Sequence, residues 1–119
     1  MDINVIELAY LGDAYYELLV RNYLIRSGIR KVDNLQKQSI KYVSAKSQAL
    51  ILNNIWEKLN EDEVDIVHRA RNYKRNVHPK NTDILTYKHS TAFEALIGYL
   101  YLNNKLDRID ELLIDIWRR

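Results

Sequence analysis

The sequence contains no cysteine, one proline and three glycines among its 119 residues. The absence of cysteine excludes a disulfide framework and thiolate metal sites. The scarcity of proline and glycine disfavours a turn-rich all-β fold and favours helices. Any chemistry that the chain performs must therefore come from carboxylates, histidines, hydroxyls or bound ions.

A long apolar run and an N-terminal targeting signal are also missing. No apolar stretch approaches the roughly 20 residues that are needed to cross a bilayer. Asp2 lies where a signal peptide would carry basic charge. We therefore expect a cytoplasmic protein with no membrane association.

What is present predicts an all-α, single-domain helical bundle over residues 1–119. Hydrophobic residues make up 47% of the chain, enough for a core, and apolar positions recur at spacings of three and four. The helices are expected over residues 4–27, 32–41, 44–59, 60 to 73 or 74, 92–102 and 106–117, with an irregular loop or short broken helix over 75–88. Their expected starts are Asp33 or Asn34, Ser44, Asn60 with Glu63, and Ser90 or Thr91, and Gly28 is the expected stop of the first helix.

The net charge of +2 conceals a localised basic region. Residues 68–89 hold six basic side chains, one acid and all three histidines, a net charge of +5, whereas the rest of the chain carries −3. Such a concentration is expected of a surface that binds a polyanion. A solvated loop with accidental charge is the alternative, and charge alone does not decide between them.

Two acids interrupt apolar helices. Asp13 follows Leu11 and Gly12 in the first predicted helix, and Glu94 follows Phe93 in the fifth. A carboxylate buried without a partner costs several kcal/mol. Each acid therefore needs a salt-bridge partner, a metal ion or an exposed stripe of helix, and these three interpretations remain open.

Glycines accompany both acids and suggest that the two helices pack closely. Gly12 is next to Asp13, and Gly98 is one turn after Glu94. Glycine is costly in a helix but lets another helix approach. Converging carboxylates without cysteine favour a hard cation such as Mg²⁺ or Mn²⁺. Beside a basic region, such a site suggests metal-assisted phosphodiester hydrolysis.

The segment 8–14, Leu-Ala-Tyr-Leu-Gly-Asp-Ala, resembles the signature helix of ribonuclease III. The segment 91–98, Thr-Ala-Phe-Glu-Ala-Leu-Ile-Gly, resembles the second catalytic motif of that family. Four further segments, 42–46, 68–72, 79–83 and 87–91, are similar to the Mini-ribonuclease III subgroup, which lacks a double-stranded-RNA-binding domain. The resemblance covers nearly the whole chain.

This resemblance implies the ribonuclease III endonuclease fold and an enzyme that cleaves double-stranded RNA to 5′-phosphate and 3′-hydroxyl ends. Mg²⁺, for which Mn²⁺ can substitute, is the implied cofactor, and Asp13 and Glu94 are the implied catalytic and metal-binding residues. Ala9 and Thr91 occupy positions that are acidic in ribonuclease III, so the number of ions stays open. The implied substrate is precursor 23S ribosomal RNA, and a ribosomal protein that presents this RNA is a candidate partner.

The basic region supplies the candidate RNA-binding residues Arg71, Asn72, Lys74, Arg75, Lys80, Asn81 and Lys88. A homodimer with one site per strand is expected, and the first helix is its expected interface. Two other hypotheses stay open: a catalytically inactive RNA-binding homodimer of the same fold, and a helical interaction protein whose acids are ordinary surface residues.

Overall fold

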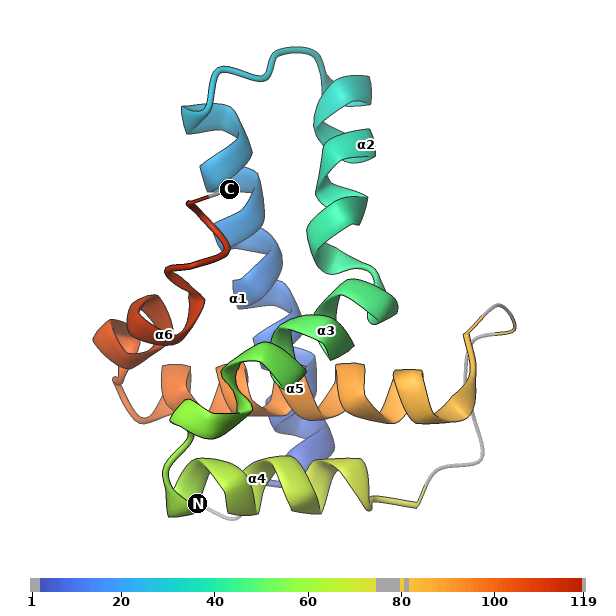
Figure 1. Cartoon of the computed structure of the whole chain (residues 1–119), viewed down its shortest axis with the longest axis vertical. Coiled ribbons are helices and arrows are strands. Elements are labelled where there is room, and N and C mark those ends of the chain that lie inside the picture. Colours follow the sequence, from blue (N-terminus) through green and yellow to red (C-terminus); the bar gives the residue numbers. More distant parts are fainter. Residues whose placement is uncertain (1–2, 75–79, 81, 119) are drawn as a thin grey trace.

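The computed structural model describes residues 3–74, 80 and 82–118, and these residues form an all-α fold (Figure 1). No strand occurs among them, so the predicted fold class is confirmed. The elements are α1 (Val5–Arg26), α2 (Val32–Val43), α3 (Ala45–Ile55), the 3₁₀ turn η1 (Trp56–Lys58), α4 (Glu61–Arg71), α5 (Ile84–Leu102) and α6 (Leu106–Leu113). Within the described part of the chain, no helix is long and apolar enough to cross a membrane.

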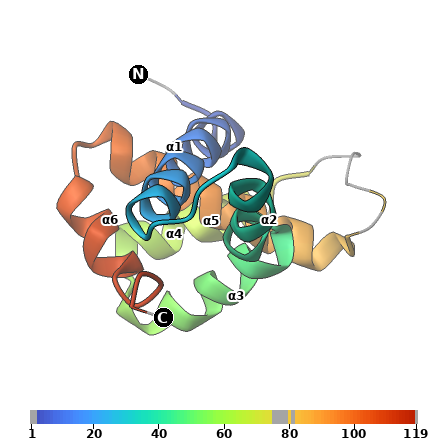
Figure 2. The same ribbon diagram turned by 90° about the horizontal axis from the view of Figure 1, so that it is seen from above.

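Helix α5 is the centre of the bundle. It packs most extensively against α1 and also contacts α3, α4 and α6. In Figure 1, α4 runs beside α5 while α1 crosses it, and Figure 2 shows the same arrangement from above. The segment 90–98 is buried apart from Glu94, which is half-buried. A helix that is covered on several sides must be apolar all round, which explains the composition of this segment.

Local capping signals set several helix starts where they were predicted. Asn60 and Glu63 form a capping box: the Asn60 N–H donates to Glu63 Oε1 at 2.9 Å, and the Glu63 N–H donates to Asn60 Oδ1 at 3.0 Å. The Ser44 hydroxyl accepts from the Ser47 N–H at 3.2 Å. Gly28, with a φ of 94°, follows the last turn of α1, as expected of a helix stop.

The predicted start of α5 at Ser90 or Thr91 is wrong. Asp83 is the N-cap: its Oδ1 accepts from the Thr86 N–H at 2.9 Å, and its Oδ2 accepts from the Thr86 hydroxyl at 2.8 Å. The helix therefore begins at Ile84, and Lys88 lies on a helix rather than in a loop. The polar composition of 75–88 concealed an ordinary aspartate cap.

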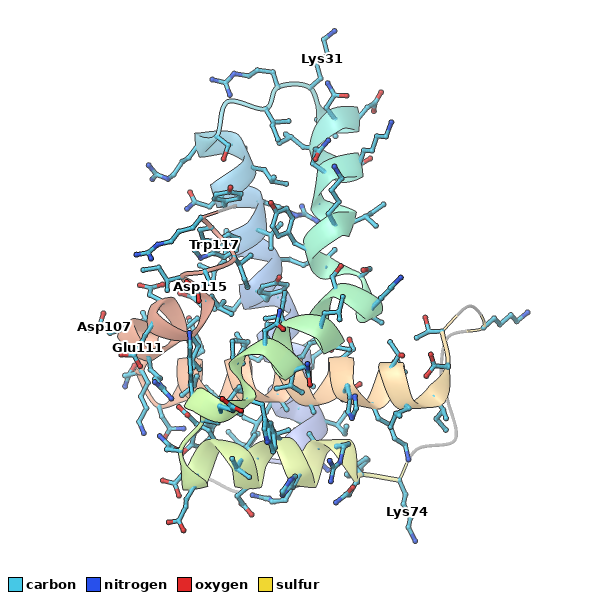
Figure 3. The ribbon with its side chains drawn as sticks, viewed as in Figure 1. Lys31, Lys74, Asp107, Glu111, Asp115 and Trp117 are labelled. Atoms are coloured by element: carbon cyan, nitrogen blue, oxygen red, sulfur yellow. The ribbon has the colours of Figure 1, made fainter. Side chains whose placement is uncertain are left out.

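The predicted opening residue of α2 and the predicted end of α6 also differ from the structure. Helix α2 begins at Val32 without a side-chain cap, and the Asn34 amide instead donates to the Arg30 carbonyl at 3.3 Å. Helix α6 ends at Leu113 and not near Trp117. The chain there tightens into turns, with the Ile116 N–H donating to the Leu113 carbonyl at 3.0 Å. The Trp117 ring, labelled in Figure 3, packs 4.9 Å from the ring of Tyr23 on α1.

Candidate active site

Gly12 and Gly98 create the closest approach of α1 and α5. A Cβ atom on Gly12 would lie 1.8 Å from the carbonyl oxygen of Glu94, and one on Gly98 would lie 1.9 Å from that of Leu8. Real Cβ atoms essentially never come within 3.0 Å of such an atom. Only glycine permits this crossing, and the expected close-packed helix pair is present.

The crossing brings Asp13 of α1 and Glu94 of α5 to one pocket. The pocket is open, has a volume of about 220 Å³, and is also lined by Ile6, Ala9, Tyr10, Tyr87 and Thr91. Asp13 is exposed, whereas Glu94 is half-buried, and the two carboxyl groups are within hydrogen-bonding reach of each other. The two acids that the sequence singled out therefore converge.

The environment of Glu94 disfavours its charged form. Burial, a hydrogen bond with Asp13 and the like charge of Asp13 raise the pKa of Glu94 to about 8. A hydrogen bond with Gln48 acts in the opposite direction. Near neutral pH the Glu94 carboxyl group therefore retains its proton, and a bound cation could take the place of that proton.

The donors of this pocket fit a Mg²⁺ or Mn²⁺ ion. Mg²⁺ is usually held by one or two carboxylates, with waters and substrate phosphates completing its coordination. Asp13 and Glu94 supply such a pair, while Ala9 and Thr91 line the same pocket without adding a carboxylate. Among the residues that the structure describes, no group of three or more His, Asp or Glu could hold a metal by itself.

Lys88 lies beside this pocket. It lines a neighbouring pocket together with Tyr73, which follows the end of α4. The two pockets share Ile6, Tyr87 and Thr91 as lining residues. Lys74 and Lys80 are exposed, and Figure 3 shows Lys74 extending away from the helices beyond the end of α4. Two of the predicted RNA-binding residues, Arg75 and Asn81, lie outside the described residues.

Arg71 faces a different part of the surface. It lines a pocket with Asn53, Trp56 and His89 that shares no lining residue with the pocket of Asp13. The Arg71 Nε donates to the exposed Asn72 side chain at 3.4 Å. The structure thus separates Arg71 from Lys88, although both belong to the basic region.

Sequence reasoning missed three residues near the carboxylates: Tyr10, Tyr87 and Gln48. Tyr87 and Thr91 lie seven and three residues before Glu94, on one face of α5. A predicted helix that began at Ile84 would have indicated that Tyr87 lies on the same face as Glu94. Tyr10 lies three residues before Asp13 on α1. Gln48 comes from α3, and no local pattern marks it.

The raised pKa of Glu94 predicts a pH-dependent stability of the metal-free protein. The folded protein keeps a proton on Glu94 up to a pH of about 8, whereas the unfolded chain releases it near the usual value of 4.5. Over that interval the folded state binds more protons, so the free energy of unfolding falls as pH rises. Thermal unfolding with chelator should show Tm falling from pH 5 to pH 8 in the wild type and falling less in Glu94→Gln. Parallel pH profiles for the two proteins would contradict this account.

Comparison with known proteins identifies the family. Residues 6–105 match the ribonuclease III domain. A Mini-ribonuclease 3 of Brevibacillus brevis is 49% identical over 110 residues, which cover 92% of this chain and 82% of that protein. A Mini-ribonuclease 3 of Staphylococcus aureus is 43% identical over 113 residues, covering 93% of this chain and 84% of that protein.

A crystal structure of a Fusobacterium nucleatum protein has the same fold. It superposes with a TM-score of 0.92 at 35% sequence identity, and the match covers 99% of this chain and 96% of that one. The conserved architecture therefore extends over the whole bundle. The chain belongs to the ribonuclease III family, within its Mini-ribonuclease 3 group, and is a ribonuclease.

Proposed function

We propose that this ribonuclease is a metal-dependent enzyme that hydrolyses double-stranded RNA to 5′-phosphate and 3′-hydroxyl ends. The observation that carries the proposal is the convergence of Asp13 and Glu94 in one open pocket, with Lys88 on the adjoining wall. Two carboxylates can hold a hard cation, and a neighbouring ammonium group can hold the phosphate backbone.

Asp13 and Glu94 are the catalytic residues of this proposal, and they would hold Mg²⁺, or Mn²⁺ in its place. When bound, such an ion polarises a phosphate oxygen and lowers the pKa of a coordinated water. The small side chains of Ala9 and Thr91 leave space in the pocket for water and a phosphate. Tyr10 and Tyr87 also line the pocket, and a tyrosine hydroxyl group can donate a hydrogen bond.

The basic region would hold the duplex through its backbone. The shallow minor groove of A-form RNA offers phosphates and 2′-hydroxyls, which basic and amide side chains recognise without reading sequence. The proposed RNA contacts are Arg71, Asn72, Lys74, Arg75, Lys80, Asn81 and Lys88. Among the described members of this set, Lys88 lines a pocket that shares Ile6, Tyr87 and Thr91 with the pocket of Asp13 and Glu94.

Removal of lysines from this surface should weaken binding and reduce its salt dependence. Each phosphate contact contributes roughly −0.9 to the slope of log affinity against log salt on a B-form duplex, and we expect a similar value for RNA. Lys74→Ala with Lys88→Ala should therefore flatten the slope by up to about two units. Duplex binding measured across a salt series, with Ca²⁺ in place of Mg²⁺, tests this expectation.

The matched control removes two exposed lysines from α2, Lys37 and Lys41. It makes the same change in net charge away from the pocket and should leave the slope unchanged. Equal slopes for the two double variants would show that Lys74 and Lys88 do not contact the RNA.

We also propose that the enzyme works as a homodimer, since two sites related by two-fold symmetry can face the two strands of one duplex. The exposed apolar side chains of α1 support this helix as the interface: Tyr10, Leu18 and Ile25 are 85%, 60% and 54% exposed. Light scattering at the concentrations that cleave RNA should report twice the chain mass of 14.2 kDa. A monomer of full activity would contradict the dimer.

Precursor 23S ribosomal RNA is the proposed substrate in the cell, with a ribosomal protein as the candidate partner that presents it. The support is the likeness to the Mini-ribonuclease 3 proteins together with the basic surface. Cells that lack this enzyme should accumulate a 23S precursor with unprocessed ends, and Asp13→Asn should fail to restore maturation. Normal 23S ends in such cells would show that precursor 23S ribosomal RNA is not the substrate of this enzyme.

Cleavage of a perfect RNA duplex tests the function itself. The purified protein should produce endonucleolytic fragments with Mg²⁺ or Mn²⁺ and none with chelator, and the same strand without its complement should be cut poorly. Binding without cleavage under every metal condition would instead favour an inactive RNA-binding protein of the same fold.

A further inference from the structure

We propose that Gln48 is a positioning residue for Glu94: its buried amide, held by the Ser90 hydroxyl, fixes the Glu94 carboxylate in the pocket opposite Asp13. This inference rests on the proposed function, because it assigns to Gln48 a task at the same metal site. Gln48 itself does not line the pocket of Asp13 and Glu94.

The distribution of buried polar side chains first points to this role. In the described part of the chain, four buried residues are polar or charged: Gln48, Glu63, Ser90 and Thr91. Glu63 is paired with Arg108 at 2.8 Å and serves to join α4 to α6. The other three all lie next to Glu94, although burial of polar groups is costly unless they are hydrogen-bonded. The core thus carries its remaining buried polar side chains beside one carboxylate.

A buried hydrogen bond with Ser90 fixes the orientation of the Gln48 amide. The Ser90 hydroxyl donates to Gln48 Oε1 at 2.6 Å, and Gln48 is only 1% exposed. With its oxygen turned toward Ser90, the amide directs its N–H donors elsewhere, and the Gln48 side chain lowers the pKa of Glu94 as such a donor does. Ser90 and Glu94 are four residues apart on α5, so they lie on one face of the helix, where a single amide can contact both.

This bridge has a specific consequence for a site with two carboxylates. A metal site that has few protein ligands depends strongly on the orientation of each, and outer hydrogen bonds provide that orientation. Asp13 is exposed and interacts with Glu94 from the solvent side, whereas Gln48 contacts Glu94 from the core. Gln48 therefore holds the carboxylate where a cation between it and Asp13 would need it.

Gln48→Met tests the proposal, because methionine keeps the length of the side chain and removes the amide. Mn²⁺ binding to the RNA-free protein, followed by electron paramagnetic resonance, should weaken about 10–100-fold. The metal concentration for half-maximal cleavage should rise by the same factor, and excess metal should restore much of kcat. Duplex affinity in Ca²⁺ should stay unchanged, which a general loss of structure would not allow.

Two further variants keep the result interpretable. Ile51→Ala removes buried atoms from the same helix outside the pocket, and it should lower Tm without changing Mn²⁺ affinity. Ser90→Ala leaves the Gln48 amide in place but unsupported, and it should weaken Mn²⁺ binding by a smaller factor than Gln48→Met. If Gln48→Met fails to fold, Ser90→Ala decides the question.

The outcomes separate this inference from the function on which it rests. If Glu94→Gln is inactive while Gln48→Met and Ser90→Ala bind Mn²⁺ as the wild type does, the positioning role is overturned and the function stands. If Glu94→Gln cleaves duplex RNA normally, the proposed function fails first. Weakened Mn²⁺ binding in both Gln48→Met and Ser90→Ala, with intact duplex affinity, supports the positioning role.

Discussion

Asp13→Asn and Glu94→Gln should each lower the rate of duplex cleavage by more than about 100-fold. Loss of a residue that only supports a metal ligand costs up to about 100-fold, and loss of a ligand itself should cost more. Each amide keeps the shape of the side chain but removes a negative charge that would hold the proposed metal. Because neither residue belongs to the basic surface, duplex affinity in Ca²⁺ should remain near that of the wild type. Single-turnover cleavage and equilibrium binding, measured on the same preparations, separate the two effects.

Asp107→Asn provides the matched control. Asp107 is an exposed carboxylate on α6, labelled in Figure 3, and it does not line the pocket of Asp13. This variant loses the same charge and should cleave as the wild type does. Near-normal cleavage by either pocket variant would show that the two carboxylates do not hold the catalytic ion.

Gly12→Ala and Gly98→Ala should destabilise the fold strongly. Overpacking of a core usually costs about 1–3 kcal/mol, and here the added Cβ would meet the backbone of another helix at 1.8 or 1.9 Å. A backbone atom cannot rotate away as a side chain can, so the free energy of unfolding should fall by at least about 3 kcal/mol. The gain in helix propensity, about 1 kcal/mol, does not offset this loss. Thermal unfolding should show Tm lowered by about 10 °C or more.

Gly28→Asn is the control for this prediction. Nothing lies within 4 Å of a Cβ atom at Gly28, and asparagine tolerates its positive φ of 94° better than other side chains do. Its Tm should change little. Stable, active Gly12→Ala and Gly98→Ala proteins would mean that α1 and α5 do not depend on this close crossing.

Local signals predicted much of the fold, and their limits explain the errors. The Asn60–Glu63 capping box could be predicted because both partners lie within one turn of the helix. The cap at Asp83 was equally local, but the polar composition around it favoured a loop. The predicted extension of α6 to Trp117 failed because the ring of Trp117 packs against Tyr23, a contact that no pattern within the helix contains.

The site could be predicted as far as its signals were local. Asp13 and Glu94 each interrupt an apolar helix beside a glycine, and these neighbours indicated that the two helices approach. Gln48 could not be predicted, because its proposed role depends on a hydrogen bond with Ser90, which is 42 residues away in the sequence. The separation of Arg71 from Lys88 likewise depends on how α4 and α5 are rotated about their axes, which net charge does not specify.

The most direct test of the account is to cleave a perfect RNA duplex in water enriched in oxygen-18. At each cut, hydrolysis at a metal held by Asp13 and Glu94 should place one labelled oxygen on the 5′-phosphate of one fragment and leave a 3′-hydroxyl on the other. The reaction should stop with chelator. Mass spectrometry of the fragments, formed with and without chelator, detects the labelled oxygen and the end groups. Products that end in a 2′,3′-cyclic phosphate, formed without labelled oxygen and without a metal requirement, would contradict the account.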